Sequence, residues 1–248
     1  MKKDSLIIAN WKMNLNINSS KELLLAVKEF IKIENFSSRV IFCPQHLLIH
    51  NLSRLFDEQS QLYLGAQDCH NHASGAYTGD NSIELLKEFN CKYVIVGHSE
   101  RRNFHSESNR LINEKIRIIE EFSLKSILCV GELIEDRKNK NYLNFISKQL
   151  LESIPSNVNE LIIAYEPIWS IGSGLVPKKS EIHEVIEFIN FCVIKHFPEI
   201  KKLSILYGGS VNSVNIEEIM SIDMINGVLV GGASIKKEEF IKILKRLI

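Results

Sequence analysis

The sequence has no excess of charge of either sign and few cysteines. Its 248 residues include 30 basic and 30 acidic side chains, so no global charge would recruit nucleic acid or an anionic membrane surface. An anionic ligand must therefore be held by local groups. The five cysteines are odd in number and form no Cys-x-x-Cys pair, which argues against a disulfide framework and a zinc ribbon. Three of them, Cys43, Cys91 and Cys129, lie in or beside apolar runs, which predicts buried, reduced thiols and a cytoplasmic protein.

Long hydrophobic runs and linkers are also missing. The apolar run near the start, Leu6–Ala9, is far too short for a signal peptide or a membrane span, and no later segment reaches spanning length. No Pro/Ser-rich or low-complexity tract divides the chain. Because α/β barrels of this length are common as one unit, we expect residues 1–248 to form a single domain.

What the sequence does contain is an alternation of short apolar runs and helical patterns. Successive runs start roughly 20 to 40 residues apart, the span of a strand plus a crossover helix. Helical stripes lie between them, and Ser19-x-x-Glu22 resembles a capping box before the first stripe. Eight such units predict an α/β fold, a parallel (β/α)₈ barrel. The predicted strands are Leu6–Ala9, Val40–Cys43, Tyr63–Ala66, Tyr93–Val96, Ser126–Val130, Leu161–Tyr165, Leu203–Tyr207 and Val228–Val230.

The most informative segment follows the sixth predicted strand. Glu166 comes directly after Leu161–Tyr165, and barrels present reactive groups at the carboxyl ends of their strands. Pro167 biases Glu166 toward extended geometry, which defines the direction of the carboxylate. Ile171–Gly174 then supplies flexible backbone with exposed N–H groups. The pattern predicts a general base beside a lid that closes on an anion.

Further polar groups follow the first and fourth predicted strands. Asn10 and Lys12 are two residues apart, so in extended chain they place a hydrogen-bond donor beside a cation. His98 ends the fourth strand, where the start of a helix would disfavour its imidazolium form and leave a neutral hydrogen-bond donor. Glu100 and Arg101 suit ion pairing near Lys12, although both also fit a charged surface.

Two Gly-Gly pairs follow the seventh and eighth predicted strands, at Gly208-Gly209 and Gly231-Gly232. The corresponding loops of barrel enzymes commonly bind phosphate through exposed N–H groups. One pair alone is ordinary turn chemistry, whereas two at these positions indicate a phosphate site. No Gly-x-Gly-x-x-Gly is present, so a dinucleotide fingerprint is excluded.

Three groupings resemble binding motifs without their full pattern. His46 and His50 have the spacing of helical zinc ligands, but the Glu of His-Glu-x-x-His is missing. Cys69–His72 has no second ligand pair and lies in the irregular connection Asp68–Asn81. Arg137–Lys140 suits a solvated helix start, not a nucleic-acid patch. We expect no metal. The long connection caps the site, reaches a partner subunit or is a solvated excursion.

Five motifs together resemble the triosephosphate isomerases. They occur in that family's order and spacing and extend across essentially the whole chain. The resemblance implies a TIM barrel and the interconversion of dihydroxyacetone phosphate and D-glyceraldehyde 3-phosphate through an enediolate. This step of glycolysis and gluconeogenesis needs no cofactor. The motifs are Asn10-Trp11-Lys12-Met13-Asn14, Gly97-His98-Ser99-Glu100-Arg101-Arg102, Ala164-Tyr165-Glu166-Pro167-Ile168-Trp169, Tyr207-Gly208-Gly209-Ser210-Val211 and Val230-Gly231-Gly232-Ala233-Ser234.

The resemblance also implies residue roles, which are the established ones for that family. Glu166 is the expected base and His98 the neutral electrophile. Lys12, beside Asn10 and paired with Glu100, stabilises charge. Substrate is expected on Asn10, Lys12 and the N–H groups of Gly172, Ser210, Gly231 and Gly232. The expected lid is Pro167, Ile168, Trp169, Ser170, Ile171, Gly172, Ser173, Gly174, Leu175, Val176 and Pro177.

The long connection is explained by the same resemblance. Its counterpart in relatives inserts into a neighbouring subunit, so a homodimer is implied, with Tyr77 and Thr78 as dimer contacts. Two departures from the family pattern stand out. Leu175-Val176-Pro177 replaces the frequent lysine of the far lid hinge and predicts altered lid kinetics. His105-Ser106 stands where Phe-Gly is common, which predicts altered water or dimer contacts.

Two alternatives stay open from the sequence. Another phosphate-binding barrel, such as a sugar-phosphate epimerase or lyase, would need a different base, a metal or a Schiff-base lysine. None of the predicted strands contains lysine. A non-catalytic barrel kept for scaffolding or ligand binding would have no need for Asn10, Lys12, His98 and Glu166 together.

Overall fold

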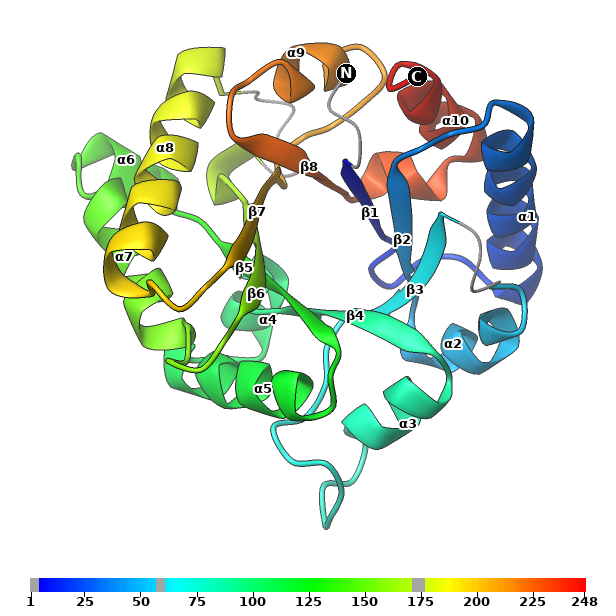
Figure 1. Cartoon of the computed structure of the whole chain (residues 1–248), viewed down its shortest axis with the longest axis horizontal. Helices are drawn as coiled ribbons and strands as arrows, with labels where there is room; N and C mark the ends of the chain where they lie inside the picture. The colour runs from blue at the N-terminus through cyan, green and yellow to red at the C-terminus, as the bar shows by residue number, and fades with distance from the viewer. Residues whose placement is uncertain (1–4, 57–60, 171–176) are drawn as a thin grey trace.

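Eight parallel strands close into a barrel in the computed structural model, which describes residues 5–56, 61–170 and 177–248. Each strand pairs with its neighbours in the chain, and β8 closes the ring on β1 (Figure 1). The predicted (β/α)₈ TIM barrel is therefore confirmed. The strands are β1 Leu6–Asn10, β2 Arg39–Cys43, β3 Leu62–Ala66, β4 Cys91–Val96, β5 Lys125–Val130, β6 Glu160–Tyr165, β7 Lys202–Tyr207 and β8 Ile225–Val230.

The helices surround this barrel (Figure 1). The prediction for the start of the first helix was wrong by about one turn. Asn16, not Ser19, is the N-cap, and its side chain and that of Ser19 accept each other's backbone N–H, both at 3.0 Å. The helices are α1 Ile17–Ile33, α2 His46–Ser53, α3 Ile83–Glu88, α4 Ser99–Phe104, α5 Asn109–Glu121, α6 Ile134–Lys138, α7 Tyr142–Ser153, η1 Ile168–Ser170, α8 Lys179–His196, α9 Ile216–Met220, η2 Gly232–Ile235 and α10 Lys237–Lys245.

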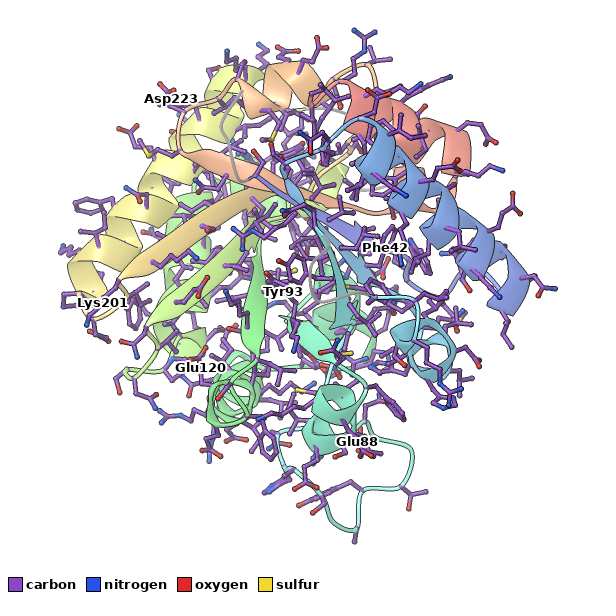
Figure 2. All side chains as sticks on the ribbon, turned by 45° about the vertical axis from the view of Figure 1, so that its right-hand side comes forward. Phe42, Glu88, Tyr93, Glu120, Lys201 and Asp223 are labelled. Atoms are coloured by element: carbon purple, nitrogen blue, oxygen red, sulfur yellow. The ribbon has the colours of Figure 1, made fainter. Side chains whose placement is uncertain are left out.

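Alternate residues of each strand belong to two separate apolar layers. Leu6 and Ile8 of β1 lie in the cluster inside the barrel, whereas Ile7 belongs to the cluster between strands and helices. Figure 2 labels one member of each layer, Tyr93 for the inside and Phe42 for the outer layer. Because the side-chain period of a strand is two, the layers predict which residues at the strand ends face the barrel mouth.

This period directs two polar residues into the mouth. Counting from Ile8, the next inward residue is Asn10, which is 5% exposed. Counting from Ala164, the next inward residue is Glu166, which is 2% exposed. The carboxyl ends of β1 and β6 therefore bring an amide and a carboxylate to the same opening.

The connection Asp68–Asn81 contains no helix or strand and extends away from the barrel (Figure 1). Its residues from Ser74 to Asp80 are all exposed. The rings of His70 and His72 pack on Tyr77, with centroid distances of 4.0 and 5.0 Å, so the connection has internal structure of its own. Among the described residues, no helix is long and apolar enough to cross a membrane.

Candidate active site

A cavity of about 370 Å³ opens at the carboxyl ends of the strands. It joins groups from β1, β4, β6, β7 and β8, which are far apart in the chain. Its lining includes most of the site residues that the motifs predicted. These are Asn10, Lys12, His98, Glu166, Gly208, Gly209, Ser210, Val211, Leu229, Gly231, Gly232 and Ala233.

Glu166 and His98 are in direct contact in this cavity. Nε2 of His98 lies 3.0 Å from Oε1 of Glu166, and the backbone N–H of Ser99 donates to Oε2 at 3.1 Å. The N–H of Glu100 donates to Nδ1 of His98 at 3.2 Å, which makes Nδ1 an acceptor. The ring proton therefore lies on Nε2, and His98 is a neutral donor aimed at the carboxylate.

The two groups also shift each other's titration. Burial raises the pKa of Glu166, but the His98 ring, the Ser99 N–H and the Lys12 ammonium outweigh it and hold the pKa below its ordinary value. Burial lowers the pKa of His98, while the Glu166 carboxylate raises it, and the net direction is upward. The prediction that the helix start disfavours the imidazolium form was incomplete, because it did not count the carboxylate opposite the ring.

Lys12 brings a cation to the lining of the cavity. Its Nζ donates to Oε1 of Glu100 at 2.6 Å, so the predicted pair is present. A Cβ built on Gly231 would lie 3.9 Å from the same Nζ, which places the ammonium beside the loop after β8. The backbone of Lys12 has φ +51°, a region that costs energy for a residue with a side chain. Its N–H donates to Oδ1 of Asn10 at 3.1 Å, which holds this conformation.

Two glycines allow the strand ends to meet closely. A Cβ on Gly131, just after β5, would lie 1.7 Å from the carbonyl oxygen of Glu166, so only glycine permits this approach of β5 to β6. Gly97, just after β4, has φ +66° and turns the chain directly before His98. Both positions therefore fix where the base and the imidazole stand.

The structure describes some, but not all, of the remaining predicted site residues. Ser210, Gly231 and Gly232 line the cavity, and Oγ of Ser210 donates to the carbonyl of Ser170 at 2.8 Å. The predicted lid begins at Pro167, continues into η1 and ends at the buried Pro177. Gly172 and the rest of lid residues 171–176 lie outside the described residues.

A buried carboxylate next to the lid was missed by the sequence analysis. Glu132 is 0% exposed, and its Oε1 accepts from Nε of Arg137 at 2.7 Å and from Nε1 of Trp169 at 2.9 Å. The prediction that Arg137 starts a solvated helix was wrong, because this pairing and the face of Tyr142 hold it near the end of α6. The signal was available, since Glu132 follows the fifth strand much as Glu166 follows the sixth.

The histidine groupings have non-metal explanations. Nε2 of His46 lies 2.9 Å from the carbonyl oxygen of Asp68, and His50 packs edge-on against Phe89. Within the described ranges, no group of three or more His, Cys, Asp or Glu side chains could hold a metal ion.

A second set of charges lies beneath the long connection, and we call Asp68, Arg101, Glu107 and Lys115 the loop-base cluster. Nζ of Lys115 contacts Oδ1 of Asp68 at 2.7 Å and Oε1 of Glu107 at 2.6 Å. Arg101 contacts the same two carboxylates at 2.9 and 2.7 Å. Arg101 was predicted to pair near Lys12 or to be a surface charge, but its guanidinium pairs with Asp68 and Glu107. We call Lys12, His98, Glu100 and Glu166 the cavity cluster.

The pKa values of the loop-base carboxyls move in opposite directions. Burial raises the pKa of Asp68 to about 6, although Lys115 and Arg101 oppose the rise. Burial also raises the pKa of Glu107, but the charges and hydrogen bonds of Lys115 and Arg101 outweigh this effect. The pKa of Glu107 is therefore below its ordinary value.

Comparisons with known proteins agree with this geometry. The family model described as Triosephosphate isomerase matches residues 5–247. A triosephosphate isomerase of Amoebophilus asiaticus is 40% identical over 98% of this chain and 99% of its own length. One from Aquifex aeolicus is 39% identical over 96% of this chain and 98% of its own. A crystal structure of triosephosphate isomerase from Bartonella henselae matches with a TM-score of 0.89 at 34% identity, covering 98% of each chain. By sequence and by fold, the chain belongs to the triosephosphate isomerase family.

Proposed function

We propose that Glu166 is the catalytic base of this isomerase and that His98, Lys12 and Asn10 stabilise the charge that develops on its substrate. The chain interconverts dihydroxyacetone phosphate and D-glyceraldehyde 3-phosphate, the reaction of glycolysis and gluconeogenesis that defines its family. The observation that carries the residue roles is the pair of contacts at Glu166: an ionised, buried carboxylate that faces a neutral imidazole donor.

The reaction needs one proton moved between adjacent carbons. Glu166 takes the proton from the carbon beside the carbonyl, which forms an enediolate, and returns it to the neighbouring carbon. The Nε2–H of His98 donates to the substrate oxygens as negative charge develops there. When a substrate oxygen accepts this hydrogen bond in place of Oε1, the carboxylate is free to reach the carbon-bound proton.

Lys12 and Glu100 provide the electrostatic side of the site. The ammonium lies between the cavity and the loop after β8, where it can attract the substrate phosphate and the developing oxyanion together. We place the phosphate on the N–H groups of Ser210, Gly231 and Gly232, with Gly172 of the lid as a further donor. Closure of lid residues 167–177 would exclude water from the enediolate.

The test is the rate of glyceraldehyde 3-phosphate conversion by the parent and by Glu166→Gln. The variant is expected to fold and to lose about 10²- to 10⁴-fold in turnover, the usual scale for a general base. Glu160→Gln is the matched control, since Glu160 lies at the amino end of the same strand and pairs with surface lysines. Near-parent turnover in Glu166→Gln would overturn the assignment.

We also infer a homodimer in which the connection Asp68–Asn81 of one copy enters a groove of the other. A groove of about 620 Å³ lies beside the cavity and shares Lys12 and His98 with it. Three of its apolar side chains, Met13, Leu47 and Phe104, are 86%, 88% and 80% exposed. Apolar groups so exposed favour a covered surface. Tyr77 and Thr78 of the connection are exposed, and we expect them to contact this groove in the partner subunit.

Size-exclusion chromatography with light scattering, which measures the molar mass in solution, tests the dimer. We expect the parent at twice the chain mass of 28.4 kDa and Phe104→Glu shifted toward a single chain. Val214→Glu is the control, because Val214 is 91% exposed and does not line the groove. A parent of one-chain mass at micromolar concentration would contradict the proposal.

Two smaller assignments complete the proposal. The five cysteines are all free and buried, which supports a protein of the reducing cytoplasm. The closed barrel uses strands from both ends of the chain, with β1 paired to β8, which supports one domain over residues 1–248.

A further inference from the structure

Arg102 lies behind the cavity and contacts neither of the openings described above. It sits on α4, two residues after Glu100, but its guanidinium points to the strand ends. Nε donates to the carbonyl of Gly97 at 2.7 Å, and Nη2 donates to the carbonyl of Cys129 at 3.1 Å. Nη1 donates to Oδ1 of Asn109 at 2.6 Å, which anchors the guanidinium to α5. One planar group therefore joins β4, β5 and α5.

The two carbonyls belong to residues that define the surroundings of Glu166. Gly97 directly precedes His98 and has the positive φ that turns the imidazole toward the carboxylate. Cys129 faces the inside of the barrel, where burial and the Glu166 carboxylate raise the pKa of its thiol. A shift of either strand end would move a direct partner of the base.

The guanidinium also acts on Glu166 through its charge. Burial lowers the pKa of Arg102, while the charges of Cys129, Glu166 and Glu107 act in the opposite direction. An interaction between two charges is reciprocal, so the cation that Glu166 stabilises in turn favours the ionised form of Glu166. Arginine keeps its charge at any working pH, which makes this a permanent positive charge in the wall.

We propose that Arg102 is a positioning residue for the isomerase reaction, which holds the ends of β4 and β5 around His98 and Glu166 without touching substrate. This inference rests on the proposed roles of Glu166 and His98. The geometry that carries the proposal is the planar fork, which holds the carbonyls of Gly97 and Cys129.

Replacement by lysine and by methionine tests whether the planar fork of Arg102 is required. Arg102→Lys keeps a cation but loses the planar fork, so turnover should fall at least tenfold while the Michaelis constant changes less than threefold. Arg102→Met loses both the fork and the cation, so turnover should fall at least as far as in Arg102→Lys, again with the smaller change in the Michaelis constant. The other titratable groups facing Glu166 are His98, Lys12 and Cys129, and all stay in place.

The measurement is kcat, KM and the pH profile of kcat/KM by direct NMR detection of the triose phosphates, with circular dichroism as the check of folding. Arg101→Gln is the control on the same helix: it should lower the melting temperature and leave kcat near the parental value. If Arg102→Lys or a folded Arg102→Met has parental kcat, the proposal is wrong. Parental turnover in Glu166→Gln would instead reject the function on which it rests.

Discussion

The cavity cluster and the loop-base cluster contain similar charges and each takes one member from α4, yet they differ in how those charges are satisfied. Glu100 of α4 belongs to the first cluster and Arg101 to the second. In the loop-base cluster, two cations contact two carboxylates, and Lys115 is only 3% exposed. In the cavity cluster, His98 and Lys12 line an open volume of about 370 Å³.

This difference shows what distinguishes a charged group that acts only on fold stability from one that can act on a ligand. A cluster that is closed and internally paired can only stabilise or destabilise the fold. A cluster whose donors face a cavity can transfer its hydrogen bonds to a ligand. Residue types alone do not separate the two, since both contain lysine and glutamate. The predictions below follow from this contrast.

The largest expected effect is on stability, from Lys115→Met. Removing the ammonium leaves Asp68 and Glu107 facing each other with only Arg101, so unfolding should become about 3–5 kcal/mol easier, the usual result of breaking a buried pair. Urea unfolding measures the change. In Lys125→Met, which breaks a partly exposed pair with Glu160, the loss should stay within about 1 kcal/mol. Equal losses in the two variants would contradict the contrast.

Lys12→Ala should impair catalysis and leave stability nearly unchanged, the reverse of what is expected for Lys115→Met. The Michaelis constant should rise and turnover should fall together, by about 10²- to 10³-fold in kcat/KM, because the charge serves bound substrate and transition state alike. The Lys12–Glu100 pair is partly exposed, so unfolding in urea should be nearly unchanged. Unchanged kinetic parameters would remove Lys12 from the cavity chemistry.

Asp68→Asn tests the pH dependence of the loop-base cluster. Burial raises the pKa of Asp68 to about 6 in the folded protein, above the ordinary value of 3.8. Between these two values the folded state binds more protons, so Asp68 makes unfolding easier as pH rises through that window. Urea unfolding of parent and variant from pH 4 to 7 should show the variant gaining stability relative to the parent as pH rises. A constant difference would refute the shift.

The smallest expected effect comes from Ser106→Gly, directly before Glu107. Ser106 has φ +54°, a left-handed conformation that suits glycine better than a residue with a side chain. The substitution should stabilise the protein by about 1 kcal/mol and leave turnover unchanged. Ser108→Gly is a useful contrast, since Ser108 is extended and caps α5; that variant should not gain stability.

The barrel was predictable because its strands are short apolar runs that recur at regular spacing. Seven strands begin one to three residues before the predicted starts, and the added first residues include Arg39, Lys125, Glu160 and Lys202. These residues are polar because they lie at the amino ends of the strands and reach solvent. An apolar pattern cannot mark such positions, since backbone pairing alone extends the strand there.

The cavity was predictable for a different reason. Asn10, His98 and Glu166 each follow a buried strand, so the rule that barrel chemistry lies at carboxyl ends brought them together. The loop-base cluster was not predictable, because Lys115 resembles any surface lysine of an amphipathic helix until α5 is packed beside Asp68. The same holds for Arg137, whose partner Glu132 comes from the preceding strand end.

The central claim is that Glu166 moves the proton in the open cluster, and isotope exchange tests it most directly. The parent and Glu166→Gln would convert glyceraldehyde 3-phosphate in deuterated water, with deuterium on the product carbons followed by NMR. The account predicts that the parent places solvent deuterium on the carbon that receives the proton and that the folded variant does so at least 10²-fold more slowly. Deuterium incorporation by the variant at the parental rate would contradict it.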